Sequence, residues 1–394
     1  MFSCRSALAS MIGSGLLFLA CANDPKTPFE TPPPAGDDAP FPPGPNGTGP
    51  ISDDAKCAGA LVTLARAPLY MLFIVDGSGS MLDPIVPGGP TGLKWSAARD
   101  ALVSFFDAMA AQKDFTFAAG LFLFDGTKGV PDFLKADVPI QYVDAAQQAL
   151  LKTRIMASTP QGGTPLKRAL EGQIPFVESF VPSAPLASGG KRVVVVLSDG
   201  VPDGSADVQP MVQQQCIDLV ENARKGPGAV TTFAVGVGDP ASTTSTYDEV
   251  FVGKLAISGG AARAGCTPGW NETSPAGQTP CHFQVTPGSK TAAQIRDELL
   301  GALDSIRGAA QGCDVALVQA DGSPGVADPS KVNVIFTDAN GVDTAVPKDS
   351  TNGWTYDDPS RPTRVVFHGE SCTKLQTVSN GKVKVELGCA TRVQ

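Results

Sequence analysis

The run of four valines at residues 193–196 constrains the fold of this chain more than any other feature. Arg192 precedes the run and Leu197 follows it, so a strand here would carry apolar side chains on both of its alternating faces. Such a strand is typical of the centre of a parallel sheet that is covered on both sides. Residues 69–75 form a second apolar run of the same kind. The sequence therefore predicts a buried, mostly parallel sheet.

The remaining stretches up to residue 312 alternate between amphipathic and apolar patterns, which predict helices and strands respectively. The helices are expected at residues 95–109, 145–156, 165–180, 208–225, 247–256 and 291–307. Further strands are expected at residues 115–124, 140–143, 230–237 and 282–285. This order predicts an α/β fold with a doubly wound, mostly parallel sheet flanked by helices, over residues 57–312.

The hydrophobic period changes to two after Cys313, which is typical of half-buried strands. Asn340-Gly341 and Asn380-Gly381 are hairpin turn signals, because both residue types tolerate positive φ. Residues 313–394 are therefore expected to form a small antiparallel β module. Its strands are predicted at residues 315–318, 331–337, 364–368 and 382–387.

The first 56 residues predict export. Residues 1–20 have a short polar start and an apolar run that is too short to span a membrane, as in a signal peptide. Phe18-Leu19-Ala20-Cys21 resembles the bacterial lipobox, although its first residue is usually Leu; the resemblance implies a lipid on Cys21, and the alternative is an ordinary signal peptide. By analogy with enteric bacteria, Ala22 favours an outer-membrane lipoprotein of the cell envelope. Residues 21–56 are then the anchor and a proline-rich linker.

Oxygen-bearing side chains gather where the two apolar runs end. Asp76-Gly77-Ser78-Gly79-Ser80 follows the first run, and Asp199 follows the valines after Leu197 and Ser198. Thr164 lies in a loop before a predicted helix. The carboxyl ends of parallel strands meet at one edge of a sheet, and carboxylate and hydroxyl oxygens suit a hard cation such as Mg²⁺. We predict a metal site formed by Asp76, Ser78, Ser80, Thr164 and Asp199.

The pattern of DxSxS, then Thr, then Asp resembles the metal-ion-dependent adhesion site of the von Willebrand factor type A (vWA) family, over roughly residues 60–310. The resemblance implies a vWA, Rossmann-like fold that holds Mg²⁺, Mn²⁺ or Ca²⁺. It implies that Ser78, Ser80 and Thr164 bind the metal directly, and that Asp76 and Asp199 do so directly or through water. A carboxylate from a protein partner would complete the shell, and the helix at residues 291–307 would be a candidate switch.

Six of the nine cysteines are candidates for disulfides. Export permits disulfides, and Cys216 is expected as a buried free thiol on the apolar face of its helix. The other six allow 15 pairings. Cys266–Cys281 would close a loop without a core pattern, Cys57–Cys313 would tie the ends of the α/β domain as in some vWA proteins, and Cys372–Cys389 would close the β module. His282 is expected at the surface beside a disulfide.

Several function classes are not favoured. A net charge of −9 opposes binding to nucleic acid. Gly236-Val237-Gly238 is followed by Pro240, which opposes the helix that a nucleotide-binding loop requires. HExxH, GxSxG and GxxxxGK[ST] motifs are absent from the sequence, so no enzyme activity is predicted.

The sequence thus predicts an envelope-anchored module for divalent-metal-dependent protein binding, in adhesion or complex assembly. The expected partner is a protein that offers an acidic side chain, and the expected membrane contact is through the lipid anchor only. Two alternatives stay open. One is a structural envelope lipoprotein with a purely stabilising metal, and the other is a carbohydrate binder that uses the C-terminal β module.

Overall fold

The computed structural model describes residues 61–64, 67–84, 91–112, 117–186, 188–205, 207–239, 247–267, 278–286, 290–317, 328–338, 341–377 and 382–387. The predicted signal peptide, the lipid on Cys21 and the proline-rich linker lie outside these residues. Within them, no helix is long and apolar enough to cross a membrane.

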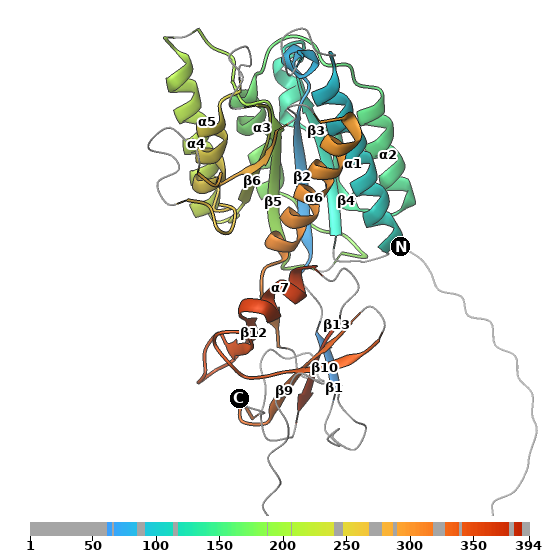
Figure 1. Cartoon of the computed structure of the whole chain (residues 1–394), viewed down its shortest axis with the longest axis vertical. Helices are drawn as coiled ribbons and strands as arrows, with labels where there is room; N and C mark the ends of the chain where they lie inside the picture. The colour runs from blue at the N-terminus through green and yellow to red at the C-terminus, as the bar shows by residue number, and fades with distance from the viewer. Residues whose placement is uncertain are drawn as a thin grey trace, which may run out of the picture. The chain divides into compact units, whose positions relative to one another are not determined.

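A six-stranded sheet forms the centre of the α/β domain (Figure 1), with the strand order β4-β3-β2-β5-β6-β7. Its strands are β2 (Leu69–Asp76), β3 (Phe117–Phe124), β4 (Val138–Tyr142), β5 (Lys191–Ser198), β6 (Thr231–Val237) and β7 (Phe283–Val285). Every neighbouring pair is parallel except β3 and β4, which are antiparallel. The two apolar runs found in the sequence are the central strands β2 and β5.

Helices cover both faces of this sheet, so the predicted α/β architecture is confirmed. They are α1 (Leu93–Gln112), α2 (Ala145–Met156), α3 (Leu166–Glu178), α4 (Gln209–Lys225), α5 (Glu249–Ser258) and α6 (Ala292–Gln311). Two short 3-10 helices, η2 (Gly79–Leu82) and η3 (Val130–Leu134), lie in loops at the sheet edge and beside α3.

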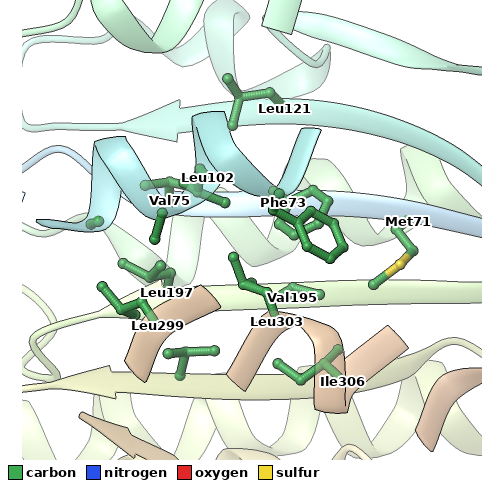
Figure 2. Packing of buried hydrophobic residues seen from close by; sticks show 14 of the residues in the cluster. Met71, Phe73, Val75, Leu102, Leu121, Val195, Leu197, Leu299, Leu303 and Ile306 are labelled. Atoms are coloured by element: carbon green, nitrogen blue, oxygen red, sulfur yellow. The ribbon is translucent and has the colours of Figure 1, made fainter. Parts of the chain in front are cut away.

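Alternation along β2 divides the core into two layers. Met71, Phe73 and Val75 pack against α1 and α6 on one face (Figure 2), while their neighbours in sequence face α3, α4 and α5 on the other. Phe73 lies edge-to-face with Phe106, with ring centroids 5.3 Å apart. The double burial explains why the central strands are almost entirely apolar.

The C-terminal module contains two antiparallel sheets, in the orders β1-β13-β9-β10 and β11-β12-β8. Its elements are β1 (Leu61–Leu64), β8 (Asp314–Ala316), β9 (Val332–Thr337), β10 (Asp343–Val346), β11 (Trp354–Tyr356), β12 (Arg364–Phe367), α7 (Gly369–Thr377) and β13 (Lys382–Leu387). The antiparallel character was predicted, whereas α7 was not. Residues 61–64, which the sequence analysis placed in the α/β domain, pair with β13 instead, because strand pairing over such a separation leaves no local signal.

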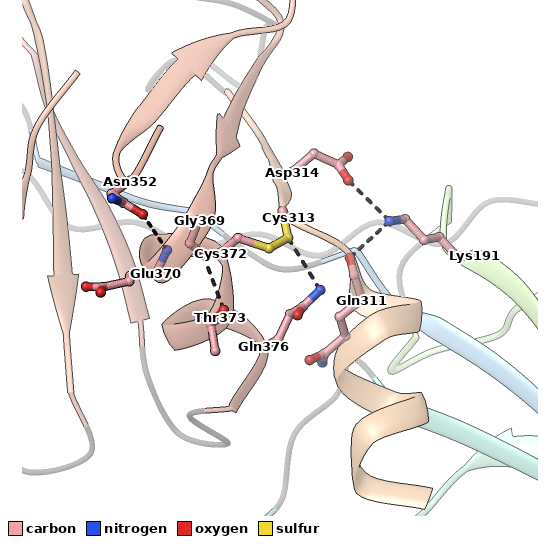
Figure 3. Close-up of a disulfide and its surroundings, with 10 residues drawn as sticks. All are labelled: Lys191, Gln311, Cys313, Asp314, Asn352, Gly369, Glu370, Cys372, Thr373 and Gln376. Carbon is pink, nitrogen blue, oxygen red and sulfur yellow. Dashed lines mark hydrogen bonds and ion pairs between the residues drawn. A yellow bond between two sulfur atoms is a disulfide. The ribbon is translucent and has the colours of Figure 1, made fainter. Parts of the chain in front are cut away.

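The structure forms two disulfides among the described residues. Cys266 is joined to Cys281 as predicted, with 4.8 Å between the Cα atoms. Cys313 is joined to Cys372, so the predicted pairs Cys57–Cys313 and Cys372–Cys389 are wrong. The reason is α7, which carries Cys372 to the point where the chain leaves α6 (Figure 3). Cys57 and Cys389 lie outside the described residues, and Cys216 is a buried free thiol, as expected.

His282 is buried rather than at the surface, which corrects the sequence-based expectation. Its Nε2 lies 2.7 Å from the Tyr247 hydroxyl and 2.7 Å from Gln284 Oε1. Burial lowers the pKa of His282 to about 4, the hydrogen bond to Gln284 opposes this shift, and the charge of Arg263 adds to it. The ring is therefore neutral in the folded protein at neutral pH.

We expect the Cys313–Cys372 bridge to contribute more to stability than Cys266–Cys281, because it closes the longer loop, 59 residues against 15. The Cys313→Ser/Cys372→Ser double variant should lose up to about 4 kcal/mol in urea unfolding, and the matched variant of the other pair about 3 kcal/mol. Peptide mapping without reduction should recover Cys313 with Cys372. Recovery of Cys313 joined to Cys57 would contradict the structure.

We expect His282 to destabilise the fold in acid, because the unfolded chain binds the proton first when the folded pKa lies below the ordinary 6.5. The free energy of unfolding should fall as the pH is lowered from 6.5 towards 4, by about 3 kcal/mol in total. When unfolding in urea is measured over this pH range, the His282→Gln variant should not show this loss of the free energy of unfolding. Parallel pH curves for the variant and the wild type would refute it.

Candidate metal centre

The two predicted carboxylates lie at the carboxyl ends of the central strands. Asp76 is the last residue of β2, and Asp199 directly follows β5. The two strands are parallel neighbours, with Val75 opposite Leu197, so their ends meet at the same edge of the sheet. Asp76 is fully buried, and Asp199 is 1% exposed. The fold thus places two carboxylates side by side without access to bulk water.

Hydrogen bonds join four of the five predicted residues into one cluster. The Ser78 backbone N–H donates to Asp76 Oδ1 at 2.9 Å. The hydroxyl oxygens of Ser78 and Ser80 are 2.9 Å apart, and the Ser80 hydroxyl donates to Asp199 Oδ1 at 3.0 Å. Asp199 and the DxSxS loop, which the sequence separates by more than 100 residues, therefore lie in contact with each other.

Thr164, the fifth residue, lies in a neighbouring loop that is tied to the DxSxS loop through the backbone. The Gln161 N–H donates to the Gly77 carbonyl at 2.8 Å, and the Gly79 N–H donates to the Gly162 carbonyl at 2.9 Å. Gly162 has a φ of 68°, a conformation that favours glycine. Thr164 is buried, and within the described part of the chain its hydroxyl makes no hydrogen bond with the other four residues.

Asp203 fixes the backbone of Thr164. The Thr164 N–H donates to Asp203 Oδ1 at 2.6 Å, and the Asp203 N–H donates to the Thr164 carbonyl at 2.9 Å. A Cβ atom on Gly163 would come within 2.4 Å of the same carboxylate, so the close approach requires glycine there. Asp203 is exposed and was not among the five predicted residues.

Lys94 and Ser198 belong to the cluster but were not predicted. Lys94 Nζ lies 2.5 Å from Asp199 Oδ2, and the Ser198 hydroxyl donates to Asp76 Oδ2 at 2.5 Å. The lysine had a sequence signal: it lies four and seven residues before Ala98 and Ala101, on the stripe of α1 that faces the core. A lysine on a buried stripe requires a charged partner.

The charges of the cluster are unbalanced. The pKa of Asp76 is raised to about 7, first by burial and then by the negative charge of Asp199, while hydrogen bonds from Ser198 and Ser78 oppose the shift. With all groups ionised, two buried carboxylates face one buried ammonium. A buried negative charge without a partner is costly, so the cluster favours an added proton or cation.

The donor atoms fit a hard divalent cation. They are oxygens of carboxylates and hydroxyls, which Mg²⁺, Mn²⁺ and Ca²⁺ prefer over nitrogen and sulfur ligands. Among the described residues, no group of three or more His, Cys, Asp and Glu side chains could hold a metal. An ion at this edge of the sheet would therefore depend on the hydroxyls of Ser78, Ser80 and Thr164 as much as on the two carboxylates.

A cavity of about 310 Å³ adjoins Thr164. Its walls include Thr164, Asp203, the ring of Phe133, and the cationic side chains of Lys128, Lys167 and Arg168. Lys128 is already paired with Asp137 and Lys167 with Glu171, at 2.7 and 3.2 Å. The walls thus combine apolar surface with charges of both signs beside the cluster.

Comparisons with known proteins agree with this architecture. The family model of the von Willebrand factor type A domain matches residues 71–256, a range that contains all five predicted residues. Among curated proteins, none matches the chain.

Solved structures similar to this chain include three bacterial proteins. The pilus adhesin SpaC from Lactobacillus rhamnosus GG, in its open conformation, is 12% identical with a TM-score of 0.44, and the match covers 87% of this chain and 44% of that one. A von Willebrand factor type A protein from Catenulispora acidiphila is 14% identical with a TM-score of 0.37, over 84% and 61%. The vWF domain of the type V pili tip protein Mfa5 from Porphyromonas gingivalis is 12% identical with a TM-score of 0.38, over 61% and 97%. This chain thus spans less than two thirds of the first two proteins.

The family match, the doubly wound sheet and the strand-end loops agree with one another. Residues 71–256 of this chain are similar to a von Willebrand factor type A domain.

Proposed function

We propose that this chain binds a protein partner through a divalent cation held at the candidate metal centre. One observation carries the proposal: Asp76, Ser78, Ser80 and Asp199 form a single hydrogen-bonded cluster. Its two carboxylates are buried and face only one ammonium, that of Lys94. Such a cluster is costly unless a cation compensates it. We infer a binding function, and we propose no catalytic step.

Each residue of the cluster would have a distinct role. Ser78, Ser80 and Thr164 would offer hydroxyl oxygens, and the two carboxylates would orient these groups, as Asp199 already does for the Ser80 hydroxyl. Asp203 would hold Thr164 in place through its two backbone hydrogen bonds. A bound Mg²⁺ would supply positive charge and a coordination position for an outside ligand.

The surroundings support a protein as the partner. Large apolar side chains are exposed on η3 and at the start of α4, two elements that also contribute to the walls of the cavity beside Thr164. They are Val130 at 67%, Leu134 at 69% and Met211 at 55% exposure. Exposed apolar groups next to a polar site are typical of protein-binding surfaces. A carboxylate is the expected anchor, because a dication held largely by neutral hydroxyls stays under-neutralised.

The disulfides and the sequence of the first 21 residues support an exported location. Disulfides are typical of exported proteins, and two are formed within the described residues. We propose attachment to the cell envelope through a lipid on Cys21, in the outer membrane. There the chain would act in adhesion or in the assembly of a surface complex.

A structural role for the ion is the competing function. It is favoured by the burial of the cluster, since Asp76 is 0% and Asp199 1% exposed. An ion so deeply placed would stabilise the fold whether or not a partner reaches it.

Thr164→Ala is the sharpest test of the metal site, because the Thr164 hydroxyl makes no hydrogen bond to the cluster whose loss would disturb the fold. We expect the wild-type chain to bind Mn²⁺ or Mg²⁺ in calorimetry and the variant to bind at least about tenfold more weakly, since one ligand is lost. Thr159→Ala, an exposed threonine before the same loop, is the matched control and should bind as the wild type does. Equal affinities for all three proteins would refute the site.

Chelation separates binding from stabilisation. If the ion serves a partner, EDTA should abolish the capture of partner protein from envelope extract while circular dichroism shows an intact fold, and Thr164→Ala should reproduce the loss. A lower melting temperature in EDTA with unchanged capture would support the structural function. Glycan binding by the C-terminal module that persists in EDTA would support the carbohydrate alternative.

A further inference from the structure

We propose that Lys94 is a built-in counter-cation of the metal centre, which leaves the loaded site with one excess positive charge and so makes an anionic ligand necessary. This inference rests on the proposed function, because it assigns the reason why the site selects a carboxylate. It concerns a residue outside the five that the sequence pattern identified.

Lys94 and the Ser80 hydroxyl bind different oxygens of the Asp199 carboxylate. Lys94 Nζ binds Oδ2 at 2.5 Å, and the Ser80 hydroxyl binds the other oxygen, Oδ1, at 3.0 Å. Only 6% of the lysine side chain and 2% of the Asp199 side chain are exposed. The ammonium therefore contacts Asp199 from the side of α1. The other carboxylate oxygen, Oδ1, accepts the hydrogen bond from Ser80 of the DxSxS loop.

Lys94 is held in this position by its helix. It lies in the first turn of α1, and its neighbours Trp95, Ala97 and Ala98 are buried in the core. The turn cannot move outwards without exposing these side chains, which would cost stability. The ammonium consequently stays beside Asp199 whether or not an ion is bound.

The charges then determine what the site requires. Asp76, Asp199 and Lys94 together carry one negative charge when all are ionised. A dication converts this into one positive charge, which in a buried site must be offset by an anion. Without the lysine, the two carboxylates would offset more of the charge of the dication and leave a weaker attraction for an anionic ligand.

Lys94→Met tests this inference because it keeps most of the side-chain volume and removes the charge. We expect Mn²⁺ alone to bind the full-length variant at least about tenfold more tightly than the wild type, since the repulsion from the ammonium is gone. Acetate added to the Mn²⁺-loaded protein should bind about tenfold more weakly, as measured by water-proton relaxation at the manganese. A lysine that merely packs would weaken both affinities when removed, so opposite changes are the signature.

Lys152→Met is the matched control. Lys152 lies on α2 and is paired with Asp107 rather than with Asp199, so its loss should leave both affinities unchanged. Lys94→Arg keeps the charge and should bind Mn²⁺ as the wild type does. Should Lys94→Met fold only when Mn²⁺ is present, the inference is supported, because the ion then replaces the missing charge.

Three results would count against the inference. Unchanged or weaker Mn²⁺ affinity in Lys94→Met would overturn it while leaving the proposed function intact. Failure of Lys94→Met to fold even in saturating Mn²⁺ would also overturn it, because the lysine would then act by packing. An absence of Mn²⁺ binding by the wild type would overturn the proposed function together with this inference.

Discussion

The burial of two carboxylates at the ends of neighbouring parallel strands is the constraint on which the site depends. The pairing of β2 with β5 brings Asp76 and Asp199 together, and helices on both faces of the sheet exclude water from them. Such a pair is stable only if hydrogen bonds and positive charge surround it. The Ser78 amide and the Ser80 and Ser198 hydroxyls supply hydrogen bonds, and the Lys94 ammonium supplies one positive charge for the two carboxylates.

The same constraint explains the composition of the loops at this edge. The loops must bring their backbones close to one another, and the glycines at positions 77, 79 and 162 permit the hydrogen bonds that join them. Asp203 lies in the loop after β5 and fixes the backbone of Thr164 through two hydrogen bonds. A site built in this way offers oxygen atoms from rigid positions, which favours a cation with defined geometry.

The end of α6 is connected to β5 through Lys191 and to α7 through the Cys313–Cys372 disulfide, as Figure 3 shows. The Lys191 ammonium binds the Gln311 carbonyl at 3.0 Å and the Asp314 carboxylate at 3.2 Å, next to the Cys313–Cys372 bridge. The final helix of the domain is therefore held to the start of β5 by the lysine. The disulfide joins α7 to the exit of α6 and does not cross back to the first strand of the domain, so the restraint differs from the one that a Cys57–Cys313 bridge would impose.

The sequence by itself determined the layered fold and the placement of Asp76 and Asp199 at the ends of its central strands. Residues 69–75 and 193–196 are apolar on both faces, which only a covered central strand allows, and the oxygen-bearing residues follow strand ends whose meeting is a rule of parallel sheets. Only the tertiary structure decided the pairing of β1 with β13, the Cys313–Cys372 bridge, the burial of His282 and the contact between Lys94 and Asp199. Each of these depends on segments that are distant in sequence and carry no shared local pattern. Their energies come from contacts that exist only after the chain has folded.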